Sequence, residues 1–187
     1  MAIKVYIDQG HNPVNPNAGA EGNGYREQDL VFRIGVLTAQ ILNNNGIQTR
    51  LSRPTASTQL GTSNSSSLAA RVNDANSWGA DVFVSLHANA SEIPSASGSE
   101  AFVYSLNSRA EVLAENILEQ LNLSTGLRNR GVSARTNLYV LRRTRMPAAL
   151  IELGFITNAG DANLMANSPS LFADGVANGV LAYFGML

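Results

Sequence analysis

The stretch that decides the fold is residues 84–90, Val84-Ser85-Leu86-His87-Ala88-Asn89-Ala90. It predicts a buried strand that ends on a histidine and then opens into a loop of small residues. The second of the chain's two histidines, His11, follows another apolar run, Val5-Tyr6-Ile7. Because ligands of open α/β sheets bind outside the carboxyl ends of the strands, we expect both imidazoles to face one crevice. This placement is the first indication of a metal site.

The composition indicates one globular domain with an almost neutral surface. The chain has 187 residues, of which 44% are hydrophobic, so it can bury a full core, and we expect a single domain over residues 1–187. Charged residues make up only 14%, and a net charge of −1 gives no electrostatic surface for nucleic acid or for an anionic membrane. With no cysteine in the chain, thiolate metal sites, disulfides and a cysteine nucleophile are excluded.

Strands and helices alternate along the chain, which is typical of a layered α/β fold. Apolar runs predict strands at residues 3–8, 47–51, 82–87, 100–104, 138–142 and 148–153. Apolar residues at helical spacing predict helices at residues 29–43, 68–78, 109–121 and 171–184. The connection from Tyr139 to Ile151 is too short for a helical crossover, so we expect some antiparallel pairing. The predicted fold is a layered, twisted, mostly parallel sheet of about six strands with helices on both faces.

Three long loops, at residues 9–24, 52–67 and 88–99, connect these elements. Loops of more than about 12 residues inside compact domains are usually functional. Because loops carry function on rigid scaffolds, we expect residues 52–67 and 88–99 to border the binding groove.

Glu152 is the most unusual carboxylate in the sequence. It lies within the apolar run of residues 148–155, which otherwise predicts a buried strand. Burying an unpaired carboxylate costs several kcal/mol unless a cation or hydrogen bonds compensate it, and a nearby metal or a raised pKa would do so. The alternative is a glutamate that points outward from an edge strand.

Two histidines and a carboxylate together favour a zinc site. A single histidine at the end of a strand is commonly a hydrogen-bonded structural residue, but catalytic zinc takes three nitrogen or oxygen ligands and keeps one position open. We expect the third ligand to be a carboxylate after the first long loop, where Glu21 and Glu27 stand. Glu27 directly precedes the first long helix, which would fix its position, although its charge could also serve the helix N-terminus.

Four motifs follow one another along the chain: Ile7-Asp8-Gln9-Gly10-His11, then Gly24-Tyr25-Arg26-Glu27-Gln28-Asp29-Leu30, then Ser85-Leu86-His87-Ala88-Asn89-Ala90, then Ile151-Glu152-Leu153-Gly154-Phe155-Ile156-Thr157-Asn158. Together they resemble the catalytic domain of the zinc-dependent N-acetylmuramoyl-L-alanine amidases, the family called amidase type 3. The resemblance covers almost the whole chain and takes in Gly98-Ser99-Glu100 and Leu138-Tyr139-Val140-Leu141-Arg142. It implies a sheet of the zinc-exopeptidase and amidase type.

The resemblance also implies a reaction. His11, Glu27 and His87 would bind one zinc ion per chain, and Glu152 would be the catalytic carboxylate. The family hydrolyses the amide between the lactyl group of N-acetylmuramic acid and L-alanine, so bacterial peptidoglycan is the expected partner. Zinc polarises a scissile carbonyl and lowers the pKa of its water to about 7, and a carboxylate such as Glu152 can pass the proton to the leaving amine.

One segment departs from the family pattern. Residues 12–17 form a longer loop than the family's turn after the first histidine, and they lack its Asp. The four site positions are unaffected, while the substrate contacts of this loop are left open.

Asn89 and Arg142 are further candidates for substrate contacts. Asn89 stands just past His87 and could hydrogen-bond the substrate or cap its own loop. Arg142, in a cluster with Arg143 and Arg145, could face the carboxylates of the stem peptide or lie on a solvated turn.

Two other functions remain open from the residues alone. A zinc exopeptidase or carboxypeptidase would share the architecture but would need a clamp for a terminal carboxylate. A catalytically inactive peptidoglycan-binding module would keep zinc, although it would have no use for a buried Glu152.

The place of action follows from the expected substrate, which lies outside the cell membrane. The N-terminus runs directly into a strand, so we expect no signal peptide, and no apolar run approaches about 18 residues, so we expect no membrane insertion. A phage endolysin, an autolysin released by mother-cell lysis in sporulation, and a domain of a longer exported protein all fit. We expect a monomer.

Overall fold

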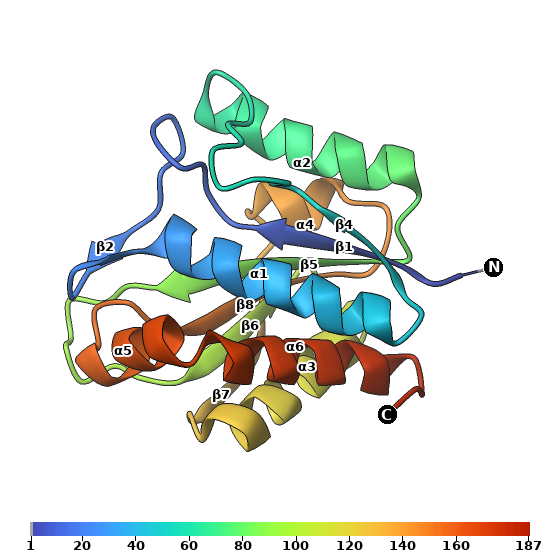
Figure 1. Ribbon diagram of the computed structural model, residues 1–187. Coiled ribbons are helices and arrows are strands. Elements are labelled where there is room, and N and C mark those ends of the chain that lie inside the picture. The colour runs from blue at the N-terminus through green and yellow to red at the C-terminus, as the bar shows by residue number, and fades with distance from the viewer. Residues whose placement is uncertain (1) are drawn as a thin grey trace.

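One mixed sheet forms the centre of the computed structural model, which describes residues 2–187 (Figure 1). Its six strands lie in the order β4-β1-β5-β8-β6-β7. All neighbouring strands are parallel except β6 and β8, which are antiparallel. The predicted fold, a mostly parallel α/β sheet of about six strands, is confirmed. The strands are β1 Lys4–Gln9, β4 Gln48–Leu51, β5 Val82–Asn89, β6 Ser99–Val103, β7 Asn129–Ala134 and β8 Ala148–Phe155.

Helices cover the two faces of the sheet unequally (Figure 1). One face carries α1 Glu27–Asn44, α3 Arg109–Thr125 and α6 Pro169–Tyr183, and the other carries α2 Asn64–Trp78 and the short α4 Tyr139–Arg143. Successive side chains of β1 alternate between these layers: Val5 and Ile7 join the larger hydrophobic cluster and Tyr6 the smaller one. The smaller cluster extends only to Phe102 on β6, so the face beyond it is not covered by a helix.

Capping residues set both ends of helix α2, of which the sequence pattern misplaces the first and predicts the second. Helix α2 begins at Asn64 rather than at residue 68, because Ser63 and Ser66 form a reciprocal capping box. Gly79 ends α2 in a left-handed conformation, which a glycine adopts without strain. The predicted loop at residues 52–67 is therefore shorter than expected.

Three elements have no counterpart in the sequence prediction. They are the hairpin of β2 Glu21–Gly22 with β3 Tyr25–Arg26, the edge strand β7, and helix α5 Ala159–Asn167. Strand β7 is exposed along almost its whole length, so it lacks the apolar alternation that marks a half-buried strand.

The strand predicted at residues 138–142 is wrong. This segment is helix α4, in which the Arg142 N–H donates to the Leu138 carbonyl. Val140 and Leu141 are consecutive and both buried, which a strand with one covered face does not allow. Short apolar runs do not distinguish a strand from a helical turn. The antiparallel pair of the sheet is β6 with β8, not a hairpin leading into β8.

Candidate active site

Three side chains from separate elements meet at the carboxyl end of the parallel strands. His11 follows β1, Glu27 begins α1, and His87 lies near the end of β5. The Glu27 Oε1 atom lies 3.1 Å from His11 Nε2 and 3.0 Å from His87 Nδ1. The two imidazole rings meet edge to face, with 4.8 Å between their centres. The structure thus brings together the three residues predicted as metal ligands.

Backbone amides from two different segments hold the Glu27 carboxylate in place. The Ala20 N–H donates to Oε2 at 2.9 Å, and the Ala88 N–H donates to Oε1 at 3.0 Å. Gly19 allows this approach, since a Cβ there would lie 2.8 Å from Glu27 Oε2. Burial by itself would raise the pKa of Glu27, but hydrogen bonds from the two imidazoles outweigh it and hold that pKa below its usual range. Glu27 also lies in the first turn of α1, where a negative charge is favoured. A role as metal ligand and a role at the helix N-terminus are therefore compatible.

A buried ion pair supports the backbone of His11, which has a left-handed φ of 66°. Arg71, from α2, lies 2.6 Å from Asp8 Oδ1, and both side chains are fully buried. The same guanidinium donates to the carbonyls of Gln9 and His11. Ser85 donates to the second Asp8 oxygen at 2.7 Å. Arg71 therefore fixes the end of β1 and, through it, the position of the first imidazole.

Gly10 makes room for the second imidazole. A Cβ at this position would lie 2.6 Å from His87 Cε1 and 2.7 Å from His87 Nε2. The Gly10 N–H donates to the Leu86 carbonyl at 3.0 Å, which ties the two histidine-bearing segments together. A side chain at residue 10 would push these segments apart.

The loop at residues 12–17 is anchored through Asn12, whose side chain is fully buried. The Asn12 amide donates to the carbonyls of Pro16 and Leu60, and its Oδ1 accepts from the Leu60 N–H. This loop and the loop that precedes α2 therefore support one another. The hydrogen bonds of the Asn12 side chain are thus made to the protein's own loops.

The donor set of His11, Glu27 and His87 fits a zinc ion. Ligand atoms at about 2.0–2.1 Å from a tetrahedral zinc lie about 3.3 Å from one another. The two nitrogen-to-oxygen distances of 3.0 and 3.1 Å are close to that value. The Nε2 atom of His11 and the Nδ1 atom of His87 both face Glu27 Oε1, as nitrogen ligands of one shared ion would. Two imidazoles and one carboxylate could hold a metal here.

Glu152 lies on β8 directly beside His87 on β5. Its Oε2 atom is buried and has no hydrogen-bond partner among residues 2–187. Burial, and then the charges of Glu27 and Glu100, raise the pKa of Glu152 to about 8. Strand β8 is central in the sheet, so the alternative of a glutamate on an edge strand is wrong. Glu152, His11 and His87 line one open cavity of about 340 Å³.

The raised pKa of Glu152 predicts a pH dependence of stability in the metal-free protein. The folded state keeps the proton up to about pH 8, whereas the unfolded chain releases it near its usual pKa of 4.5. The stability supplied by the neutral form is therefore complete below about pH 4.5 and is lost as the pH rises toward 8, at up to about 1.4 kcal/mol per pH unit. Urea denaturation between pH 5 and 8 should show a steeper decline for the metal-free native chain than for Glu152→Gln. If stability changed with pH in the same way in both proteins, the raised pKa would not belong to Glu152.

The structure places the other candidates less directly. The Asn89 amide donates to Glu100, and its Oδ1 accepts from the N–H of Ala90, so it caps its own loop. Its predicted contact with substrate stays a prediction. The Glu21 side chain is exposed and lies 3.7 Å from Arg26, and it does not belong to the group formed by the two histidines and Glu27.

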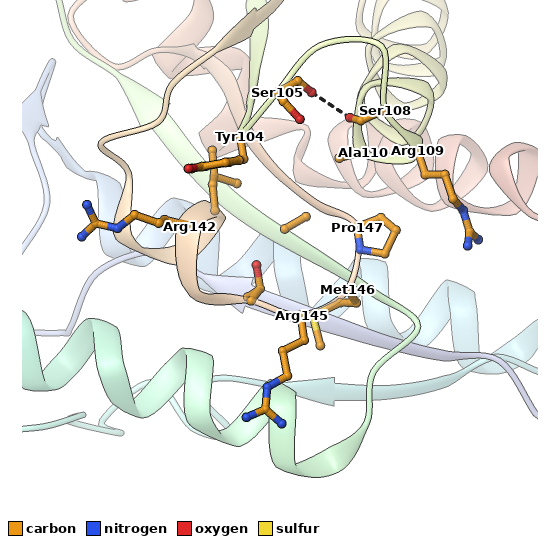
Figure 2. Close-up of a pocket in the computed structure, with 12 residues that line it drawn as sticks. Tyr104, Ser105, Ser108, Arg109, Ala110, Arg142, Arg145, Met146 and Pro147 are labelled. Atoms are coloured by element: carbon orange, nitrogen blue, oxygen red, sulfur yellow. Dashed lines mark hydrogen bonds between the residues drawn. The ribbon is translucent and has the colours of Figure 1, made fainter.

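Arg142 lies in a different hollow from Glu152. Figure 2 shows it with Tyr104, Arg109 and Arg145 around a second cavity of about 320 Å³. This cavity lies near Ala148, at the start of β8, whereas Glu152 lies farther along that strand. The structure therefore does not bring Arg142 together with the metal-ligand group.

The cavity that holds Glu152 also contains residues that the sequence prediction does not single out. Phe102 on β6, Arg135 just past β7, and Asn137 and Leu138 before α4 line it. Phe102 lies on a strand that the sequence predicts, Arg135 and Asn137 lie in the connection from β7 to α4, and Leu138 begins the segment that the prediction assigns to a strand. Phe102, Arg135 and Asn137 belong to none of the motifs, because only the folded sheet brings them beside Glu152.

Comparisons with known proteins agree with this arrangement. A family model described as N-acetylmuramoyl-L-alanine amidase matches residues 5–182. The chain is 33% identical over 193 positions to the N-acetylmuramoyl-L-alanine amidase CwlM of Bacillus licheniformis, a match that covers 98% of this chain and 70% of the relative. It is 34% identical over 189 positions to the sporulation-specific N-acetylmuramoyl-L-alanine amidase of Bacillus subtilis (strain 168), covering 98% and 69%. A solved structure, the catalytic domain of the N-acetylmuramoyl-L-alanine amidase CwlV from Bacillus (Paenibacillus) polymyxa var. colistinus, is similar with a TM-score of 0.86 at 29% identity, covering 99% of both chains.

Proposed function

Because the chain belongs to the N-acetylmuramoyl-L-alanine amidase family, we propose that it is a zinc-dependent hydrolase of bacterial peptidoglycan. The bond cleaved is the amide between the lactyl group of N-acetylmuramic acid and L-alanine. The observation that carries the proposal is the convergence of His11, Glu27 and His87 beside a cavity that both histidines line together with Glu152, whose buried Oε2 atom is unpaired.

The three converging residues are the proposed ligands of a single zinc ion. When bound, zinc supplies a Lewis acid that polarises the scissile carbonyl and makes water more acidic. Glu27 and the two imidazoles are already close together, and the buried Arg71 and Asp8 pair keeps the His11 backbone in position. Little reorganisation is then needed on binding.

Glu152 is the proposed general base and acid. Its carboxylate takes a proton from the attacking water as the new C–O bond forms, and gives that proton to the nitrogen as the C–N bond breaks. The products are a free lactyl carboxylate on the sugar and a free amine on L-alanine.

The competing functions are less well supported. A binding module gains nothing from Glu152, whose buried Oε2 is unpaired. For a carboxypeptidase, the sequence suggests the Arg142 cluster as the clamp for a terminal carboxylate, and Arg142 and Arg145 lie around a different cavity. Among residues 2–187, no helix has both the length and the apolar content to cross a membrane. Peptidoglycan is the proposed partner, and we propose that the protein acts on it as a monomer.

Metal removal tests the proposal. Purified peptidoglycan is digested with the protein as prepared, after treatment with a chelator, and after zinc is restored. We expect soluble stem peptides that begin at L-alanine, lost on chelation and recovered with zinc, as detected by mass spectrometry. Intact muropeptides in all three samples would favour the binding module. Shortened peptides still attached to sugar would favour the exopeptidase.

A further inference from the structure

The cavity that contains Glu152 continues across the sheet toward its β7 edge. On β6 the side chains alternate between buried and half-buried, and Glu100 and Phe102 are on the half-buried face. In the sheet register, Glu100 pairs with Glu152 and Phe102 pairs with Leu150. Phe102 and Arg135 line the cavity together with Glu152, so the cavity extends from β8 over β6 to the end of β7.

Arg135 also lines this cavity. Its backbone N–H donates to the Val103 carbonyl at 2.8 Å, which fixes the chain at the end of β7. Its guanidinium lies over the Phe102 ring, 5.0 Å from the ring centre. A cation held against an aromatic face is stabilised modestly and is oriented by the ring. Arg135 therefore presents its guanidinium along the wall of the cavity.

Within residues 2–187, the Arg135 guanidinium has no carboxylate within 4 Å and no hydrogen-bond acceptor. The nearby Arg130 is different, since it lies 3.9 Å from Glu100. No acidic residue occurs from position 120 to position 151, although this segment carries six arginines. An arginine with five free donors in a planar fork is suited to bind a carboxylate through two parallel hydrogen bonds.

The sheet geometry gives the distance at which such a carboxylate would be bound. Phe102 is the diagonal neighbour of Glu152 across the β6–β8 pair, which separates their Cα atoms by about 8 Å. An extended peptide spans about 3.5 Å per residue, so a group two residues beyond the scissile amide lies about 7 Å from it. The second residue of a stem peptide therefore reaches the guanidinium that rests on Phe102.

In peptidoglycan, L-alanine is followed by D-isoglutamate, whose α-carboxyl group is free in some walls and amidated in others. We propose that Arg135 binds the free carboxylate of this second residue and makes the enzyme prefer stem peptides that are not amidated there. The inference rests on the proposed function, because it takes the scissile amide to be the one next to Glu152.

The test compares two soluble disaccharide-dipeptides that differ only in this group, one with isoglutamate and one with isoglutamine. We expect kcat/KM to be about tenfold higher for the acid, as is typical of a charge-assisted hydrogen bond, with most of the difference in KM. Arg135→Gln should abolish this preference. Arg143→Gln, an exposed arginine that lines neither cavity, should keep it.

Three outcomes would overturn the inference: equal kcat/KM for the two substrates in the native chain, a preference that survives Arg135→Gln, or a preference that is lost in Arg142→Gln instead. Binding to the Glu152→Gln variant, measured by calorimetry, separates this inference from the proposed function. If neither substrate is cleaved, the proposed function fails. A tighter dissociation constant for the acid, lost in the Glu152→Gln/Arg135→Gln double variant, would still support the role of Arg135, and equal constants would refute it.

Discussion

Replacing Glu152 with glutamine is expected to lower kcat on peptidoglycan by about 10³-fold while zinc stays bound. Glutamine has nearly the same shape, but it cannot accept the proton of the attacking water. The three proposed ligands are not touched by this change, so the zinc content of the purified protein should be unaltered. The release of new amino groups gives kcat, and elemental analysis gives the zinc content.

The Glu152→Gln change is also informative about folding. It removes a buried carboxylate that has no hydrogen-bond partner for one of its oxygens among residues 2–187, so stability at pH 8 should rise rather than fall. Glu119→Gln, an exposed change on α3 at the opposite face of the sheet, is the matched control and should leave kcat unaltered. Activity of Glu152→Gln within tenfold of the native chain would remove this residue from the mechanism.

Replacing Arg71 with methionine is expected to lower the free energy of unfolding by about 3–5 kcal/mol, the range found when one partner of a buried ion pair is removed. The change leaves Asp8 charged and buried, and it leaves the carbonyls of Gln9 and His11 without a donor. Burial would raise the pKa of Asp8, but the Arg71 guanidinium and the Ser85 hydroxyl hold it below its usual range. Urea denaturation at neutral pH measures the loss.

Two variants control the Arg71 experiment. Arg50→Met removes an exposed pair with Asp74 and should cost less than about 1 kcal/mol. The double variant Asp8→Asn/Arg71→Met also removes the buried, unpaired charge of Asp8, so it should recover part of the lost free energy of unfolding. Zinc affinity should fall in Arg71→Met, since His11 loses its backbone support. A loss no larger than that of Arg50→Met would show that the ion pair does not fix this end of β1.

The sheet could be predicted from the sequence because its central strands are buried on both faces. Runs such as residues 82–87 and 148–153 are almost wholly apolar, and intervening helical patterns imply parallel neighbours. Strand β7 could not be predicted, because it is exposed and is defined by its pairing with β6. Helix α4 was predicted as a strand for another reason: an apolar run of five residues is too short for its periodicity to distinguish a strand from a helical turn.

The convergence of His11, Glu27 and His87 could be predicted because two of them end strands that the fold rules place side by side. The residues that hold other side chains in position could not be predicted. Arg71 lies within a helix whose pattern does not distinguish a buried arginine from an exposed one. Arg135 has no local signature, since its position depends on the ring of Phe102 on a neighbouring strand. Such residues are placed by tertiary contacts, and tertiary contacts produce no recognisable pattern of spacing in the sequence.

The double hydrogen bonding of Glu27 couples ion binding to the conformation of the first loop. One carboxylate oxygen accepts from Ala20 in that loop and the other from Ala88 at the end of β5, so the carboxylate meets both amides only while the loop keeps this position. The position of this loop and the binding of the proposed zinc ion are therefore coupled equilibria. A ligand that favours this position of the loop would raise the affinity for the proposed zinc ion, and the ion would raise the affinity for that ligand by the same factor. Substitutions that loosen the loop would therefore weaken ion binding without altering any ligand residue.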